Sequence, residues 1–185
     1  MRRLEGFAAL LAKWQRAINL VAPDSLPDIW RRHMLDSAAL LPLIPKTAAT
    51  VVDLGSGAGF PGLVLAIMGV PQVHLIESDS RKCAFLAEAG RLFAQGRATV
   101  LRGRIEAVPR SKADVVTARA LAELPKLLAY AHPFLKPGGI CLFPKGKDVE
   151  DELTLAGQTW TMTLERLPNP ADSSGTILRI KGLAR

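Results

Sequence analysis

Apolar and polar positions follow a repeating order along most of this chain. From residue 47 onward, short apolar runs typical of buried strands alternate with longer segments whose apolar residues recur at the helical period. The pattern predicts strands at 50–54, 73–77, 98–102, 113–118 and 139–144, and helices at 61–68, 80–95, 123–135 and 148–156. Because strands that alternate with helices form parallel, doubly wound sheets, an α/β fold is expected.

The N-terminal part departs from this alternation. Residues 4–20 and 26–41 read as two amphipathic helices with prolines between them. We therefore expect a helical cap at 1–46 and a Rossmann-like core at 47–185.

The C-terminal part departs from it as well. The apolar runs 159–167 and 176–181 are joined by a loop rich in Pro, Asn, Ser and Gly, with no helical segment between them. Such a pair predicts an antiparallel hairpin. The expected sheet thus has five parallel strands plus a C-terminal antiparallel hairpin.

Length and composition fit one soluble globular protein. Its 185 residues are 49% hydrophobic and 22% charged, enough to bury a sizeable core. The apolar stretch near 63–70 is too short to cross a bilayer and the N-terminus carries charges within its apolar pattern, so we expect a cytoplasmic protein without membrane contact. Cys83 and Cys141 lack metal-ligand spacing, so reduced thiols are expected, with no disulfide and no metal site.

The charge is distributed unevenly. The chain has a formal net charge of +7. Residues 81–147 hold thirteen Lys and Arg against four Asp and Glu, a net +9, whereas the segment from 148 onward is net −2. A concentrated basic segment favours a polyanionic partner, and nucleic acid is the commonest one.

The loop after the first predicted strand carries a nucleotide-binding pattern. Residues 51–63 read VVDLGSGAGFPGL, an apolar run that ends in Asp53 and continues into a glycine-rich turn. Glycine suits turns that need positive φ and places where backbone lies against a ligand. Glu77 ends the next predicted strand about twenty residues later, where nucleotide-binding βαβ units place an acid for ribose hydroxyls.

The glycines alone fit two cofactors. Gly57, Gly59 and Gly62 satisfy the G-x-G-x-x-G spacing of dehydrogenases, so this loop leaves a nicotinamide cofactor open. With Asp53 and Gly55 the pattern becomes D-x-G-x-G-x-G, which resembles motif I of class I S-adenosylmethionine-dependent methyltransferases. The C-terminal hairpin and the turn Leu-Lys-Pro-Gly-Gly before the fifth strand resemble that fold too.

A series of short motifs runs along nearly the whole chain. In order they are Lys13-Trp14, Asn19-Leu20, Arg32-His33, Asp36-Ser37, DLGSGAGFPG, the run 81–86, Arg104-Ile105-Glu106, Arg119-Ala120 and Lys145-Gly146. The ordered set is more specific than any of its members. It resembles the RsmG (GidB) family, the 16S rRNA guanine-N7 methyltransferases.

This resemblance implies an enzyme that uses S-adenosyl-L-methionine and acts on 16S ribosomal RNA, free or in a small-subunit assembly particle. We expect the protein to be a monomer. Together with the loop motif, it assigns cofactor binding to Asp53, Gly55, Gly57, Gly59, Phe60, Glu77, Ile105, Glu106 and Arg119. It places Arg119 and Lys145 at the reaction, and it assigns RNA binding to Arg81, Arg104, Lys145 and His33.

Two of these assignments have structural alternatives. Asp53 could hold the loop by accepting backbone N–H bonds instead of touching the cofactor. His33 and Asp36 lie three residues apart on a predicted helix, where a local pair is as reasonable as a substrate-facing one.

The residues also restrict the chemistry. Methylation of an exocyclic amine usually goes with an Asn/Asp-Pro-Pro-aromatic loop after the fourth strand, where this chain reads TARALAEL, and carbon-five methylation requires a nucleophilic cysteine. Guanine N7 has a lone pair and no proton, so its attack on a sulfonium methyl needs positioning and no general base. Two alternatives stay open at this point, a small-molecule methyltransferase and a non-catalytic RNA-binding protein of the same fold.

Overall fold

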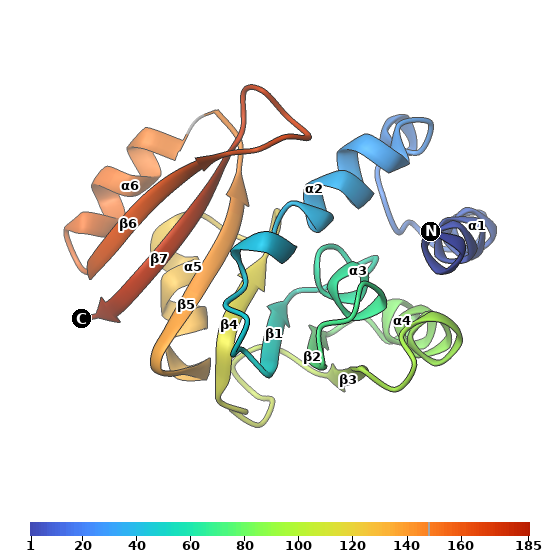
Figure 1. Ribbon diagram of the computed structural model, residues 1–185, viewed down its shortest axis with the longest axis horizontal. Coiled ribbons are helices and arrows are strands. Elements are labelled where there is room, and N and C mark those ends of the chain that lie inside the picture. Colours follow the sequence, from blue (N-terminus) through green and yellow to red (C-terminus); the bar gives the residue numbers. More distant parts are fainter. Residues whose placement is uncertain (148) are drawn as a thin grey trace.

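The computed structural model describes residues 1–147 and 149–185, and within them seven strands form one sheet with helices on both faces (Figure 1). The strand order is β3-β2-β1-β4-β5-β7-β6, parallel from β3 to β5 and antiparallel for β7 and β6. The strands are β1 (Thr50–Leu54), β2 (Gln72–Glu77), β3 (Ala98–Arg102), β4 (Ala113–Ala118), β5 (Leu135–Lys145), β6 (Thr161–Pro168) and β7 (Thr176–Ala184). The predicted five parallel strands and antiparallel hairpin are confirmed.

Both faces of the central strands are buried, which explains their continuous apolar runs. Val51 and its neighbours on one face pack against α1 (Arg2–Gln15), α3 (Gly62–Ile67) and α4 (Ser80–Phe93). Val52 and its neighbours on the other face pack against α5 (Leu124–Ala131) and α6 (Val149–Gly157). The sheet therefore lies between two helical layers, and its loops beyond the strand ends stay free to form a site.

Helix α1, in the N-terminal segment, packs against α3 and α4 on one face of the sheet. Phe7 and Leu11 of α1 are fully buried in the same cluster as Leu63 and Phe85. The predicted first helix was too long, because it ends at Gln15 instead of residue 20. The Gln15 side-chain oxygen accepts the N–H groups of Leu20 and Val21, each at 3.0 Å, and so fastens the segment that follows α1 to the end of this helix.

The predicted second helix, 26–41, is also corrected. The chain forms a 3-10 turn at Pro23–Ser25, a π-helix at Trp30–Leu35, the short α2 at Asp36–Ala38 and a second 3-10 turn at Leu41–Leu43. The N–H of Asp36 donates to the carbonyl of Arg31, five residues earlier. This wide turn leaves the Arg32 carbonyl available to a side chain from elsewhere.

Two further boundaries differ from the predicted ones. Helix α5 ends at Ala131 and a 3-10 turn at His132–Phe134 leads directly into β5, because Pro133 has no N–H with which to continue the helix. Strand β5 accordingly begins at Leu135 instead of residue 139. Helix α6 begins at Val149, and residue 148, where it was predicted to start, lies outside the described residues.

No helix in the described part of the chain is both long and apolar enough to span a membrane.

Candidate active site

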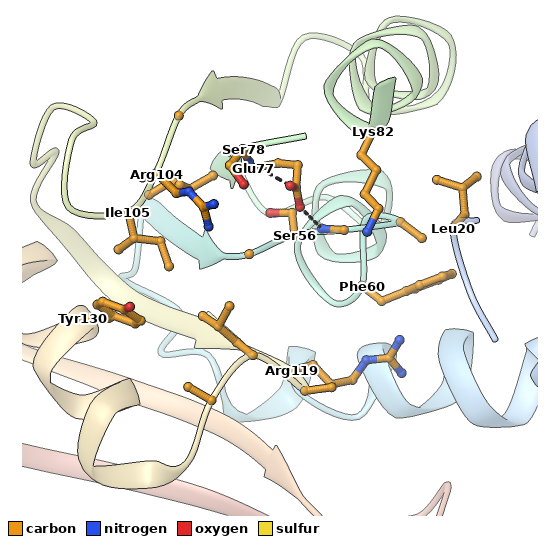
Figure 2. Close-up of a pocket in the computed structure, with 18 of the residues that line it drawn as sticks. Leu20, Ser56, Phe60, Glu77, Ser78, Lys82, Arg104, Ile105, Arg119 and Tyr130 are labelled. Atoms are coloured by element: carbon orange, nitrogen blue, oxygen red, sulfur yellow. Dashed lines mark hydrogen bonds between the residues drawn. The ribbon is translucent and has the colours of Figure 1, made fainter. Parts of the chain in front are cut away.

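A cavity of about 500 Å³ opens at the carboxyl ends of β1, β2 and β4 (Figure 2). We call it the first cavity. The glycine loop forms its floor, and Leu20 and Val21 of the fastened N-terminal segment form part of its wall. In Figure 2, Lys82, Phe60 and Leu20 lie on one side, and Arg104, Ile105 and Tyr130 lie on the other. The site thus occupies the position where ligands bind in open α/β sheets.

The glycines of the loop serve different purposes. Gly55, Gly57 and Gly59 all have positive φ, of 63°, 55° and 91°. A Cβ on Gly55 would lie 2.6 Å from Leu121, and one on Gly59 would lie 2.8 Å from Leu63. Close packing against these leucines therefore explains why both positions are glycine. A Cβ on Gly57 would find no protein atom nearer than 3.8 Å. Gly57 therefore leaves room above the loop, which a ligand can use.

Glu77 joins the loop to the end of β2. Its Oε2 accepts the N–H of Gly57 at 2.9 Å, and its Oε1 accepts those of Ser78 and Asp79 at 2.7 and 2.8 Å. Because a carboxylate oxygen accepts about two hydrogen bonds, Oε1 is saturated and Oε2 keeps one free lone pair. Glu77 lines the first cavity, so this lone pair is available to a ligand hydroxyl.

Asp53 lies beneath the loop and is fully buried. Its Oδ1 accepts the hydroxyl of Thr117 at 2.8 Å, and a Cβ on Gly62 would come within 2.5 Å of the Asp53 Cβ. Burial raises the pKa of Asp53 to about 6. Asp53 is not among the described residues that line the cavity, and the hydrogen-bond partner of its carboxylate is the Thr117 hydroxyl, not a backbone N–H of the loop.

Several cationic side chains face the first cavity, including some that the sequence did not single out. Lys82 and Lys126 line the first cavity together with Arg104 and Arg119. Arg81, predicted to bind RNA, is exposed at the start of α4 and lines neither cavity among the described residues. Neighbouring residues of a helix point about 100° apart, so the helix turn brings Lys82 toward the site and Arg81 away from it.

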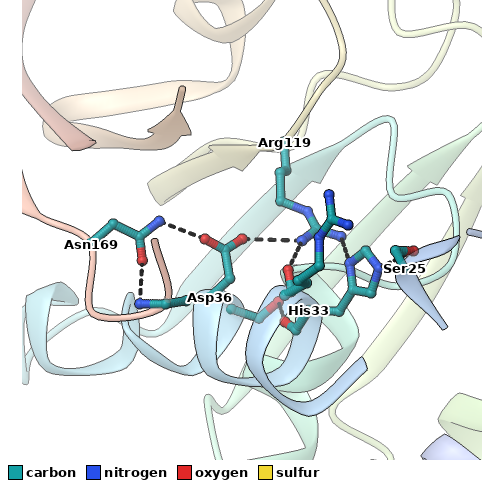
Figure 3. A network of polar contacts seen from close by, with 8 residues as sticks. Ser25, His33, Asp36, Arg119 and Asn169 are labelled. Atoms are coloured by element: carbon teal, nitrogen blue, oxygen red, sulfur yellow. Dashed lines mark hydrogen bonds and ion pairs between the residues drawn. The ribbon is translucent and has the colours of Figure 1, made fainter. Parts of the chain in front are cut away.

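Arg119, just after β4, is held by a polar network (Figure 3). Its Nη1 donates to the Arg32 carbonyl at 2.9 Å and to Asp36 Oδ2 at 3.1 Å. Its Nη2 contacts His33 Nδ1 at 2.7 Å. The guanidinium also lies 5.1 Å from the ring centroid of Phe60. A guanidinium has five N–H groups, so two remain for a ligand.

The network fixes the tautomer of His33. Since the guanidinium of Arg119 has only donors, Nδ1 accepts and Nε2 carries the proton, which it donates to Ser25 Oγ at 2.8 Å. Burial, with Arg119 and Arg32 nearby, lowers the pKa of His33 to about 4, so the ring is neutral at pH 7. The ring stacks on Phe60 with centroids 4.9 Å apart.

Asp36 connects this network to the other end of the chain. Asn169, in the β6–β7 loop, donates from Nδ2 to Asp36 Oδ1 at 2.7 Å, and its Oδ1 accepts the N–H of Ala171 at 3.0 Å. Asp36 and Asn169 are both buried, and their partners are each other, the Arg119 guanidinium on Asp36 Oδ2 and the Ala171 N–H on Asn169 Oδ1. Sequence analysis gave no signal for Asn169.

A second cavity, of about 660 Å³, lies on the other side of Arg119. We call it the second cavity. It shares Arg119 and Ala120 with the first cavity. Lys145 also lines it, with Nζ bonded to Glu152 Oε2 at 2.5 Å and to the Ala122 carbonyl at 3.0 Å. One of the three N–H groups of Lys145 therefore remains for a ligand.

The structure thus divides the predicted site residues into four groups. Seven of the predicted cofactor residues line the first cavity, namely Gly55, Gly57, Phe60, Glu77, Ile105, Glu106 and Arg119. Arg104 lines it too, whereas His33 and Lys145 line the second cavity. Asp53 and Gly59 are packed around the loop, and Arg81 stands apart.

Both cysteines are buried away from these cavities. Burial raises the pKa of Cys83 and of Cys141. The Cys83 thiol donates to the Glu77 carbonyl at 3.3 Å. Within residues 1–147 and 149–185, no three His, Cys, Asp or Glu side chains are grouped so that they could hold a metal ion.

Proteins of one family are similar to this chain along nearly its whole length. The model of a family described as GidB, rRNA small subunit methyltransferase G, matches residues 1–177. A ribosomal RNA small subunit methyltransferase G from Paramagnetospirillum magneticum is 56% identical over 185 residues, which cover 100% of this chain and 90% of that protein. One from Rhodospirillum centenum is 56% identical over 182 residues, 98% of this chain and 84% of that protein.

Solved structures share the fold at low identity. A SAM dependent methyltransferase from Aquifex aeolicus aligns with a TM-score of 0.62 and 18% identity, over 85% of this chain and 93% of that one. TYW2 from P. horikoshii, solved in complex with MeSAdo, aligns with a TM-score of 0.59 and 17% identity, over 87% of this chain and 62% of that one.

Proposed function

The chain belongs to the GidB family of rRNA small subunit methyltransferases G, and from this premise we propose that it transfers the methyl group of S-adenosyl-L-methionine to N7 of a guanine in 16S rRNA. The observation that carries this proposal is the first cavity, in which the glycine loop, Glu77 and Arg119 meet at the carboxyl ends of the strands. Its position and lining suit a nucleoside cofactor.

The residues of the first cavity fit S-adenosyl-L-methionine. Gly57 leaves open space above the loop, and the free lone pair of Glu77 Oε2 suits a ribose hydroxyl. Ile105 and Tyr130 supply apolar surface for an adenine ring, and Lys82, on the opposite side, supplies positive charge for a carboxylate. When bound, the cofactor supplies a methyl group activated by a sulfonium. Asp53 has no contact with the cofactor in this account and packs against Gly62 beneath the loop, with its carboxylate bonded to Thr117 of β4.

Methyl transfer to N7 needs correct placement of the reactants more than proton transfer. Arg119 lies between the two cavities, and three partners fix its guanidinium. We assign to it the positioning of the guanine beside the cofactor, through its two free N–H groups. Lys145 has one free N–H at the second cavity and is assigned to the RNA on the reaction side. His33 is neutral at pH 7 and acts here by holding Arg119.

The alternative nucleophiles have little support in the structure. Cys141 is fully buried in β5, and burial raises its pKa, so it is unsuited to the covalent attack that carbon-five methylation requires. The segment after β4 contains no Pro-Pro-aromatic loop for an exocyclic amine. N7, which carries a lone pair at neutral pH, fits a site of fixed cations without a general base.

Two measurements test the proposed function. Calorimetry should show binding of S-adenosyl-L-methionine and none of NAD, which would separate the two readings of the glycines. Mass spectrometry of 16S rRNA, treated with and without the protein, should show one added methyl group on a guanine, detected as 7-methylguanosine after digestion. Tight NAD binding, or unmodified rRNA both free and in small subunits, would overturn the proposal.

A further inference from the structure

We propose that the second cavity receives the target guanosine as a single nucleotide swung out of the RNA. This inference rests on the proposed function, because it assigns the substrate side of the same reaction. The second cavity is built by four segments that are distant in sequence, at 31–36, 119–120, 144–146 and 169–172. At about 660 Å³ it lies within the range of about 300–1,000 Å³ that small-ligand sites occupy.

The two cavities meet at one boundary. Arg119 and Ala120 line both of them, so a base in the second cavity reaches the first cavity beside these two residues. Ala120 has φ of 51°, a conformation that L-residues rarely adopt and that is enriched at functional sites. Transfer requires the two reacting atoms to approach within about 3–3.5 Å, which a shared boundary allows and separated pockets would not.

The nucleophile explains why the nucleotide must leave the RNA stack. In an A-form helix, N7 faces a deep and narrow major groove that side chains do not enter. Enzymes that modify a base therefore act on single strands or extrude the target into a pocket. The second cavity is a pocket of this kind, because it lies beside the donor cavity and cationic side chains stand around it.

The charges of the second cavity suit both the nucleotide and its product. Arg32 is exposed on the rim and, among the described residues, its side chain forms no hydrogen bond or ion pair, so it is available to a phosphate. In the reaction the N7 lone pair forms the new N–C bond, and the electron pair of the broken C–S bond stays on sulfur. The positive charge consequently passes to the purine. Asp36 and Asp172 offset part of the positive charge of the four Lys and Arg side chains that line this cavity, which reduces their repulsion of a cationic 7-methylguanine.

A pair of matched glycine substitutions tests the assignment. Gly146 lines the second cavity, and a Cβ there would meet nothing within 4 Å. Gly157, at the end of α6, has equally open surroundings and lies outside both cavities. Gly146→Phe should reduce methyl transfer to rRNA at least about 100-fold, while the Kd for S-adenosyl-L-methionine stays within about twofold. Gly157→Phe should leave both unchanged. Full transfer by Gly146→Phe would overturn the inference.

Cross-linking gives a second, independent measurement. The methylated guanosine is first located by mass spectrometry and then replaced with photoreactive 6-thioguanosine in a transcript of the same region. Irradiation should attach it to peptides that contain residues 31–36, 144–146 or 169–172 of the wild-type protein, and Gly146→Phe should reduce the yield. Attachment elsewhere would overturn the second cavity as the substrate site. A wild-type protein that transfers no methyl group would instead overturn the proposed function itself.

Discussion

The two cavities are built in contrasting ways. The first is centred on one local motif, since the glycine loop is tied to β2 through the Gly57 N–H that Glu77 accepts, and residues 20–21 and 103–130 complete its lining. The second is formed by side chains from distant segments, of which Asp36 and Asn169 lie 133 residues apart. A motif can specify the first kind of site, whereas the second depends on the whole fold. Arg119 is the residue at which the two meet.

Arg119→Ala should have the largest effect on this arrangement. We expect methyl transfer to fall about 10²- to 10³-fold, as when one preorganised donor is removed from an active site. Arg119→Lys should not restore it, because an ammonium cannot reproduce the planar fork that contacts Arg32, Asp36 and His33. The measurement is single-turnover transfer to rRNA, with thermal melting to confirm folding. Methyl transfer by Arg119→Ala at the wild-type rate would contradict the role of Arg119 in positioning the guanine between the two cavities.

Gly57→Val should affect the first cavity and, because Gly57 has a φ of 55°, should also lower stability through backbone strain. The new side chain would occupy the space above the loop, and we expect S-adenosyl-L-methionine to bind about 100-fold more weakly, a loss of about 2.7 kcal/mol. Gly59→Val is the comparison, because it has the same kind of backbone strain and its side chain would also collide with Leu63, so its melting temperature should fall further. Calorimetry and melting curves distinguish the two variants. Equal loss of stability in both would mean that Gly57 also serves packing.

Asp36→Asn should affect the second cavity with a smaller magnitude. It removes the negative charge paired with Arg119 but retains a group that can hydrogen-bond to Asn169. We expect transfer to fall about tenfold, equivalent to about 1.4 kcal/mol of barrier, with cofactor affinity nearly unchanged. Glu150→Gln breaks the exposed pair with Arg166 and should change neither quantity. A loss of cofactor affinity in Asp36→Asn would show that the network serves both cavities equally.

The smallest expected effect is a pH dependence of stability that arises from His33. Its folded pKa, about 4, lies below the ordinary value of 6.5, so the unfolded chain binds the proton more readily. The contribution to stability is present above pH 6.5 and is lost as the pH falls through 4. Since the ring is partly exposed, we expect only about 1 kcal/mol after solvent screening.

A variant isolates this contribution of His33 from that of Asp53. The raised pKa of Asp53, about 6, has the opposite sign, because it makes stability fall as the pH rises toward 6. His33→Gln should remove the contribution of His33 to the pH dependence of stability and leave that of Asp53 in place. Denaturant unfolding of both proteins between pH 4 and pH 7 gives the difference curve, and a flat difference would contradict the lowered pKa of His33.

The contrast between the cavities also explains what the sequence could predict. Apolar periodicity gave the sheet, and the loop motif with Glu77 located the first cavity, because these signals are local. Lys126 and Tyr130 were missed, since their approach depends on how α5 packs. The π-helical turn before Asp36 and the bond from Asn169 depend on contacts far apart along the chain, and no spacing rule encodes them.

The most direct test of the central claim is methylation of an rRNA substrate in which 7-deazaguanosine replaces the target guanosine. This replacement removes the nucleophilic nitrogen and keeps the Watson–Crick edge of the base. With radiolabelled S-adenosyl-L-methionine, the guanosine transcript should acquire one methyl group and the deaza transcript none, although both compete equally for the protein. Continued methyl transfer to the deaza transcript would contradict N7 as the acceptor.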